Sequence, residues 1–77
     1  MPSKADETLA MYQRATRLAE RRNYQRAIDL FRQVLAGAPD HVEARRNLGM
    51  ALLEAGNVEE AKVHLEEALR INPRKVW

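Results

Sequence analysis

Side chains that could perform catalysis are few in this sequence and far apart. Ser3 is the single serine, His41 and His64 are the two histidines, and cysteine is absent. Nucleophilic catalysis needs a nucleophile next to a general base, which this spacing does not supply. The three glycines form no phosphate-binding loop, because they are explained as two helix ends and a packing contact. We therefore predict that the protein is not an enzyme.

One histidine has neighbours that could hold a metal ion. Glu60 precedes His64 by four residues and Glu67 follows it by three, so the three side chains share one face of a helix. A single helix nevertheless supplies a weak ligand set for a metal such as zinc. We interpret His64 as an exposed residue beside solvated glutamates, and His41 as a surface residue at a helix start. The sequence predicts neither a metal nor a cofactor.

A group of arginines forms a basic ridge. Arg14, Arg17 and Arg21 are spaced by three and four residues, and Arg22 and Arg26 follow at a predicted turn. The ridge could meet RNA or an acidic protein segment, but aromatic side chains for base stacking are scarce near it. A balance of 13 basic to 11 acidic residues is too even for binding nucleic acid by bulk charge. We favour a solvated ridge, then an acidic protein partner, then RNA.

The elements that position these side chains are predicted to be helices. Apolar residues recur every three or four positions, which is the period of an amphipathic helix and not that of a strand. Asn23 is of a type that begins helices, and Asp40 and Asn57 are each followed three residues later by glutamate, as in a capping box. Gly37 and Gly56 are of a type that ends them. The spacing predicts an all-α protein with helices at residues 5–21, 24–36, 41–55 and 58–71.

The sequence repeats itself with a period of 34 residues. The segment 27–35, followed by Pro39, returns as the segment 61–69, followed by Pro73. A fixed period of this length indicates a helical-hairpin solenoid, in which each unit buries its apolar face by stacking on a neighbour. The connections are short, so successive helices must be antiparallel. These features predict a surface that holds another molecule.

The repeated positions point to a known family. The second repeat carries Leu48-Gly49, Leu52, Ala61, Leu65, Ala68 and Pro73, and the first carries Ala15, Leu18, Tyr24, Ala27, Phe31, Val34 and Pro39. With this pattern the chain resembles the tetratricopeptide repeat family. Three positions depart from it, since Met11 and Arg45 stand where the family prefers tryptophan, and Arg14 stands where it prefers leucine.

The resemblance implies one domain over residues 1–77, with repeat one at about 8–41 and repeat two at about 42–75. The two hairpins would stack as a right-handed α-solenoid that works as a non-catalytic interaction or assembly module. Its concave face, built from the first helix of each hairpin, would bind a peptide or a partner helix. The partner-binding residues that the resemblance implies are Leu9, Tyr12, Thr16, Arg46, Asn47, Met50 and Leu53.

Some members of this family bind a peptide's terminal carboxylate in a clamp of basic and amide side chains. Asn47 matches one position of that clamp. Tyr12 and Thr16, however, stand where the clamp has lysine and asparagine, so the resemblance does not favour this variant of peptide binding.

Two repeats are fewer than the roughly three that a stable solenoid normally needs. We therefore expect the surface that would receive a third repeat to be partly open, and we assign to it Leu52, Leu65, Leu69, Ile71 and Trp77. The chain could be a piece of a longer array, could associate with itself through this surface, or could use Trp77 as a partial lid. Self-association is attractive because a symmetric dimer would bury the surface.

We expect a cytoplasmic location, because cysteine is absent and the first residues do not resemble a secretory signal. No stretch approaches the roughly 18 consecutive apolar residues of a membrane helix. The main hypothesis is a module that binds a protein or peptide and could form homo-oligomers. The alternative is a basic helical-repeat module that binds RNA or an acidic segment through Arg14, Arg17, Arg21 and Arg22.

Overall fold

The computed structural model describes residues 1–74, which fold into four helices and no strand. The helices are α1 (Lys4–Glu20), α2 (Tyr24–Gly37), α3 (Val42–Glu54) and α4 (Val58–Ile71). The all-α prediction is confirmed, and each helix bound lies within one residue of the predicted range. None of the described helices is both long enough and apolar enough to cross a membrane. Trp77, assigned to the open surface, lies outside the described residues.

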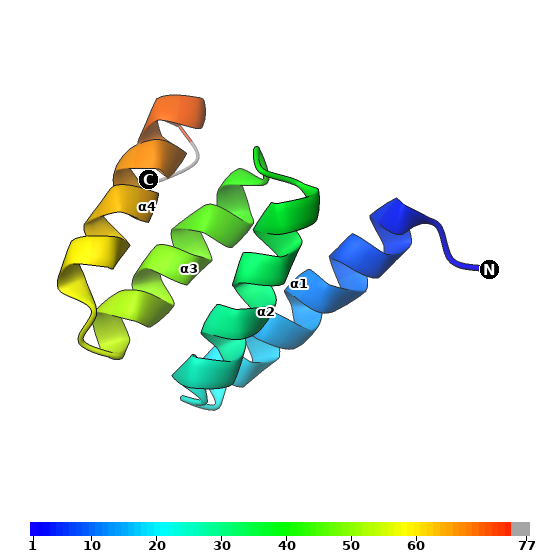
Figure 1. The fold of residues 1–77 in the computed structure, drawn as a ribbon, viewed down its shortest axis with the longest axis horizontal. Coiled ribbons are helices and arrows are strands. Elements are labelled where there is room, and N and C mark those ends of the chain that lie inside the picture. Colours follow the sequence, from blue (N-terminus) through cyan, green and yellow to red (C-terminus); the bar gives the residue numbers. More distant parts are fainter. Residues whose placement is uncertain (75–77) are drawn as a thin grey trace.

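The helices form two antiparallel hairpins, α1 with α2 and α3 with α4, which stack on each other (Figure 1). The junction between the hairpins is made mainly by α2 packing against α3, with a smaller contact between α1 and α3. As Figure 1 shows, α4 lies at the opposite end of the molecule from α1. This is the stacked-hairpin architecture that the 34-residue period predicts.

Both hairpin turns use the same backbone hydrogen bonds. At the end of α1, the N–H groups of Arg22 and Asn23 donate to the carbonyl oxygens of Ala19 and Leu18, and the pattern recurs 34 residues later at Gly56. Each turn is a Schellman motif, which places a residue of left-handed conformation directly after the C-cap of the helix. That residue is Arg22, with φ of 63°, in the first turn and Gly56, with φ of 90°, in the second.

The capping of the helix starts differs from the capping that the sequence predicts. The N-cap of α3 is His41 and not Asp40, because His41 Nδ1 accepts a hydrogen bond of 3.1 Å from the N–H of Ala44. Asn23 and Asn57 do occupy the N-cap positions of α2 and α4, but their side chains accept no capping bond within residues 1–74. The capping box expected at Asn57 was therefore wrong. The Schellman turns hold both residues at ψ near 70°, away from the extended conformation usual at an N-cap.

The core continues across the junction of the hairpins. Its largest fully buried side chains include Phe31 and Ile28 from α2 and Leu48 and Leu52 from α3. Leu52 is 0% exposed, so its assignment to an open surface was wrong. Helix α3 turns this side chain inward, where α2 and α3 meet, and the next residue in the chain takes the outward position.

Helices α3 and α4 approach each other closely at Gly49. A Cβ atom at this position would lie 2.6 Å from Cγ of Leu65, which is closer than van der Waals contact allows. Glycine at this position therefore lets the two backbones come together. The equivalent residue of the first hairpin, Ala15, is fully buried.

Candidate functional site

A groove of about 220 Å³ lies between α1 and α3, and we call it the α1–α3 groove. Its lining comes from α1, α2 and α3: Thr16, Ala19, Glu20, Tyr24, Phe31, Asn47, Met50, Ala51 and Glu54. Three of the predicted partner-binding residues, Thr16, Asn47 and Met50, belong to this lining. Met50 is 49% exposed. A large apolar side chain in contact with water beside a groove is a candidate for binding.

Tyr12 has a structural position that the sequence did not reveal. Its hydroxyl oxygen accepts a hydrogen bond of 3.0 Å from Nδ2 of Asn47, which ties α1 to α3. Its ring lies with its centroid 6.1 Å from that of Phe31 and 4.9 Å from that of His41. The ring therefore packs partly against the core.

The remaining predicted partner-binding residues do not meet in the α1–α3 groove. Leu9 is 52% exposed and lies near the start of α1, beside Lys4 and His41. Leu53 lines a different groove, formed with α4. Arg46 is half-buried, and its Nε is shielded from solvent without a hydrogen-bond partner among residues 1–74. The structure thus separates side chains that the sequence pattern had grouped together.

Two glutamates give the α1–α3 groove an acidic character. Glu20 and Glu54 stand 34 residues apart, at equivalent positions of α1 and α3, and both line the groove. Neither carboxylate forms an ion pair within the described part of the chain. Neither glutamate is among the predicted partner-binding residues. Their 34-residue spacing is the signal that could have found the pair, because equivalent residues of stacked repeats are neighbours.

A second groove, of about 370 Å³, opens on the outer side of α4, and we call this surface the α4 face. It is lined by Leu53, Val58, Lys62, Leu65, Glu66 and Leu69. Of the residues assigned to the open surface, Leu65 and Leu69 are found here. Ile71 is half-buried and does not line this groove.

Most of the arginines of the predicted ridge gather on α1 and at the start of α2, away from the α4 face. Arg14, Arg17 and Arg21 line a pocket together with Arg26 and Leu18. Arg22 does not line this pocket, because its left-handed conformation places it in the turn between α1 and α2. Arg26, which the sequence had also placed in the ridge, lies in the first turn of α2 and does line the pocket.

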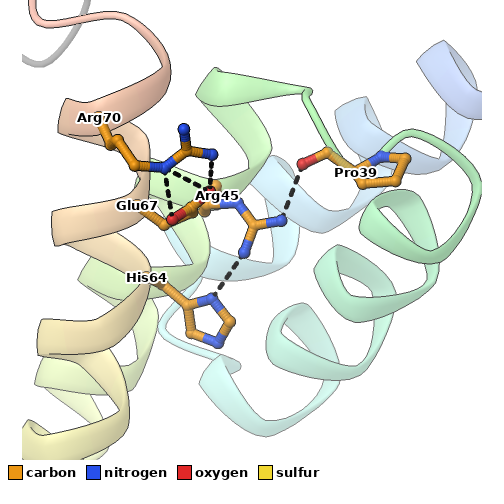
Figure 2. A network of polar contacts seen from close by, with 5 residues as sticks. All are labelled: Pro39, Arg45, His64, Glu67 and Arg70. Atoms are coloured by element: carbon orange, nitrogen blue, oxygen red, sulfur yellow. Dashed lines mark hydrogen bonds and ion pairs between the residues drawn. The ribbon is translucent and has the colours of Figure 1, made fainter.

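His64 belongs to a polar network that connects α4 to α3 and to the loop between α2 and α3 (Figure 2). Nη1 of Arg45 lies 3.2 Å from Nδ1 of His64, and Nη2 of Arg45 donates to the carbonyl oxygen of Pro39 over 2.8 Å. Arginine can only donate, so Nδ1 accepts and the proton resides on Nε2, which lies 3.4 Å from Glu60. The side chain of His64 is only 17% exposed, so the interpretation of His64 as an exposed residue was wrong.

Two carboxylates near this network are held in the charged form. The hydrogen bond from Arg32, which reaches across from α2, lowers the pKa of Glu60 below its usual value. The hydrogen bond from Arg70, and to a lesser degree the charge of Arg45, lowers the pKa of Glu67. Residues 1–74 bring no three metal-ligating side chains together. The network therefore joins helices through charge-assisted hydrogen bonds.

Comparison with known proteins agrees with this architecture. The family model described as tetratricopeptide repeat matches residues 18–77, which include all of α2, α3 and α4. No curated protein and no solved structure matches the sequence. On the strength of the stacked hairpins, the 34-residue period and the family match, the chain belongs to the tetratricopeptide repeat family.

Proposed function

We propose that the α1–α3 groove binds a protein segment in which an apolar side chain lies next to a lysine or arginine. Tetratricopeptide repeat proteins typically mediate protein–protein interactions, and they are generally non-catalytic. The observation that carries the proposal is the combination of an apolar groove with two carboxylates that have no ion-pair partner in the described structure.

The centre of the groove can accommodate the apolar side chain of the ligand. Ala19, Tyr24 and Met50 offer accessible carbon surface there, and Met50 is a flexible side chain that adapts to different apolar partners. The cationic part is suited by Glu20 and Glu54, because a charge-assisted hydrogen bond to a carboxylate is stronger than a neutral one. Thr16 and Asn47 supply further polar groups for the backbone of the bound segment.

The experiment is a selection from a random peptide library displayed on phage, with the purified chain as bait. We expect the selected peptides to combine an aliphatic or aromatic residue with lysine or arginine. Binding of a synthetic selected peptide is then measured by fluorescence anisotropy. Met50→Lys places a cation in the groove and is expected to weaken binding at least about tenfold, a loss of about 1.4 kcal/mol.

A matched control is available on α4. Val63 is 61% exposed and lines neither the α1–α3 groove nor the α4 face, so Val63→Lys should leave binding unchanged. Glu20→Gln and Glu54→Gln should each weaken binding and should reduce its dependence on salt. If the selected peptides lack basic residues, or if Met50→Lys and Val63→Lys have equal effects, the α1–α3 groove is not the binding site.

The alternative function is supported by the pocket formed by Arg14, Arg17, Arg21 and Arg26, whose guanidinium groups could hold an acidic segment or RNA. Binding of this kind would weaken steeply as salt is raised. Fluorescence anisotropy with a labelled poly-glutamate peptide and a labelled RNA oligonucleotide distinguishes it. Arg17→Glu would abolish such binding, whereas it would leave a ligand of the α1–α3 groove bound.

A further inference from the structure

The α4 face is an apolar surface without a cover among residues 1–74. Val58, Leu69 and Leu53 are 55%, 42% and 39% exposed, and all three line the same groove. Lys62 and Glu66 lie between the apolar residues, one helical turn apart on α4. Grouped exposed apolar side chains of this kind, rimmed by polar residues, mark contact surfaces.

The 34-residue period indicates which kind of element binds to the α4 face. Leu65 and Leu69 of α4 are the equivalents of Phe31 and Leu35 of α2, the helix that packs against α3 at the junction of the two hairpins. Phe31 is 0% and Leu35 is 8% exposed. The α4 face therefore repeats a surface that binds a helix, and its natural occupant is another helix.

The N-terminal end of a second copy is a poor occupant. In head-to-tail stacking, α1 of one copy would take the place that α3 takes on α2. The α1 residues equivalent to the core residues Leu48 and Ala51 are Arg14 and Arg17. Such stacking would bury two guanidinium groups against leucine side chains, and burial of an unpaired charge is costly.

We propose that the α4 face binds the α4 face of a second copy in a two-fold symmetric dimer, with the two α4 helices antiparallel. The stripe along α4 reads Val58, Lys62, Glu66 and Leu69, which is apolar, basic, acidic and apolar. In an antiparallel copy the order is reversed, so Val58 faces Leu69 and Lys62 faces Glu66 of the second copy. A two-fold interface must be complementary to itself. This stripe is self-complementary, because apolar residues face apolar residues and each basic residue faces an acidic one.

The dimer goes beyond binding at the α1–α3 groove, because the two surfaces share no lining residue. Each copy in the dimer keeps its own groove open. The α4 face is small, so we expect a dimer of modest affinity, with a dissociation constant in the micromolar range or weaker.

The test is sedimentation equilibrium of the 77-residue chain over a series of concentrations. We expect a monomer–dimer equilibrium without larger species. With Lys62→Glu, two carboxylates face each other at each of the two charge contacts, and with Glu66→Lys two ammonium groups do so. Each variant alone should dimerise about tenfold more weakly than the wild type.

A mixture of the two variants gives the decisive result. In a mixed dimer every contact again joins a carboxylate to an ammonium group, so an equimolar mixture should dimerise as strongly as the wild type. Glu59→Lys, an exposed position of α4 outside the groove, serves as the charge-matched control and should dimerise normally. Far-UV circular dichroism checks that each variant is folded.

Three outcomes would overturn the proposal. The wild type could remain monomeric at every concentration, the single variants could dimerise as well as the wild type, or mixing could fail to restore the dimer. Species that grow beyond two copies, and that disappear in an Arg17→Glu variant, would show head-to-tail stacking. None of these results affects the proposal for the α1–α3 groove, because the groove and the α4 face share no lining residue.

Discussion

At the scale of single residues, the two hairpin turns solve the same backbone problem with different side chains. Gly56 adopts φ of 90° and Arg22 adopts φ of 63°. Left-handed conformation is free of steric cost for glycine, whereas any residue with a Cβ atom is strained in it. The first turn therefore holds strain that the second turn lacks.

Replacing the strained residue should stabilise the protein. We expect Arg22→Gly to raise the free energy of unfolding by about 1 kcal/mol, which corresponds to a rise in Tm of roughly 4–8 °C for a domain of this size. Thermal unfolding followed by circular dichroism measures the change. Arg21→Gly is the control, because Arg21 has φ of −86° and glycine gains nothing there. Equal shifts for the two variants would contradict the prediction.

The ion pair between Arg32 and Glu60 should make stability depend on acidity. The pKa of Glu60 is lower in the folded than in the unfolded state, so the unfolded state binds more protons as the solution is acidified. The contribution is complete above the unfolded-state pKa of about 4.3 and is lost as pH falls through the folded-state pKa. Both side chains are well exposed, so the effect is at most about 1 kcal/mol.

The measurement is the urea midpoint of unfolding between about pH 3 and pH 7, a range that brackets the usual pKa of glutamate. Arg32→Gln should lower the midpoint near neutral pH and leave it nearly unchanged at the acidic end. Arg70→Gln, which removes a pair to Glu67 within one helix, is expected to have a smaller effect, because a local pair partly survives unfolding. A larger effect from Arg70→Gln would mean that the contact between α2 and α4 is not important.

At the scale of helices, Arg45 connects α3 to α4 where the family prefers tryptophan. The guanidinium bonds to His64 and to the carbonyl of Pro39, and its Nε is shielded without a partner among residues 1–74. A polar group in such a position is stabilising only while its other bonds are made. The α3–α4 contact therefore depends on Arg45 and His64 together.

A double-mutant cycle tests this dependence. His64→Phe alone leaves one arm of Arg45 without an acceptor and should lower the free energy of unfolding by about 1 kcal/mol. In an Arg45→Met background the same change should cost little, which gives a coupling energy of about 1 kcal/mol. Urea denaturation of the four proteins measures it. Additivity of the two single changes would show that the hydrogen bond between α3 and α4 adds nothing to stability.

At the scale of the whole molecule, the two hairpins share one core through Phe31. Phe31 is fully buried, and it lies between α1 residues such as Tyr12 and the α3 side that forms the groove. Its equivalent in the second hairpin, Leu65, is half-buried and lines the α4 face. Residues at equivalent positions therefore contribute differently to stability, because within residues 1–74 α2 is covered by the second hairpin and α4 is not covered by a further helix.

Truncation of these two residues should show the difference. Phe31→Ala is expected to cost about 3–5 kcal/mol, a large part of the roughly 4–11 kcal/mol available to a chain of this length. Leu65→Ala should cost only about 1–2 kcal/mol, because part of its side chain already contacts water. Urea denaturation at low protein concentration, where dimer does not contribute, measures both. Equal losses would contradict the shared core.

The fold of the chain was predictable because its determinants are local or periodic. Helix type and length follow from apolar residues at the helical period, and the 34-residue repeat follows from aligning the segment that begins at Ala27 with the one that begins at Ala61. Both signals can be read from the sequence without knowing which helices contact each other. The family resemblance rests on the same signals, and the match over residues 18–77 confirms it.

The composition of the surfaces depended on tertiary structure. Each residue step along a helix turns the side chain by about 100°, and the packing of the helices decides which of these directions is covered. Leu52 is buried and Leu53 lines the α4 face, although they are adjacent and equally apolar. Of the ridge arginines that follow Arg21, Arg26 lines the arginine pocket and Arg22 does not, because Arg22 lies in the left-handed turn between α1 and α2. The pairing of Tyr12 with Asn47 and of Glu20 with Glu54 joins residues of different hairpins. The sequence by itself determined the helices and their repeat, and only the packing of one hairpin on the other decided which side chains meet.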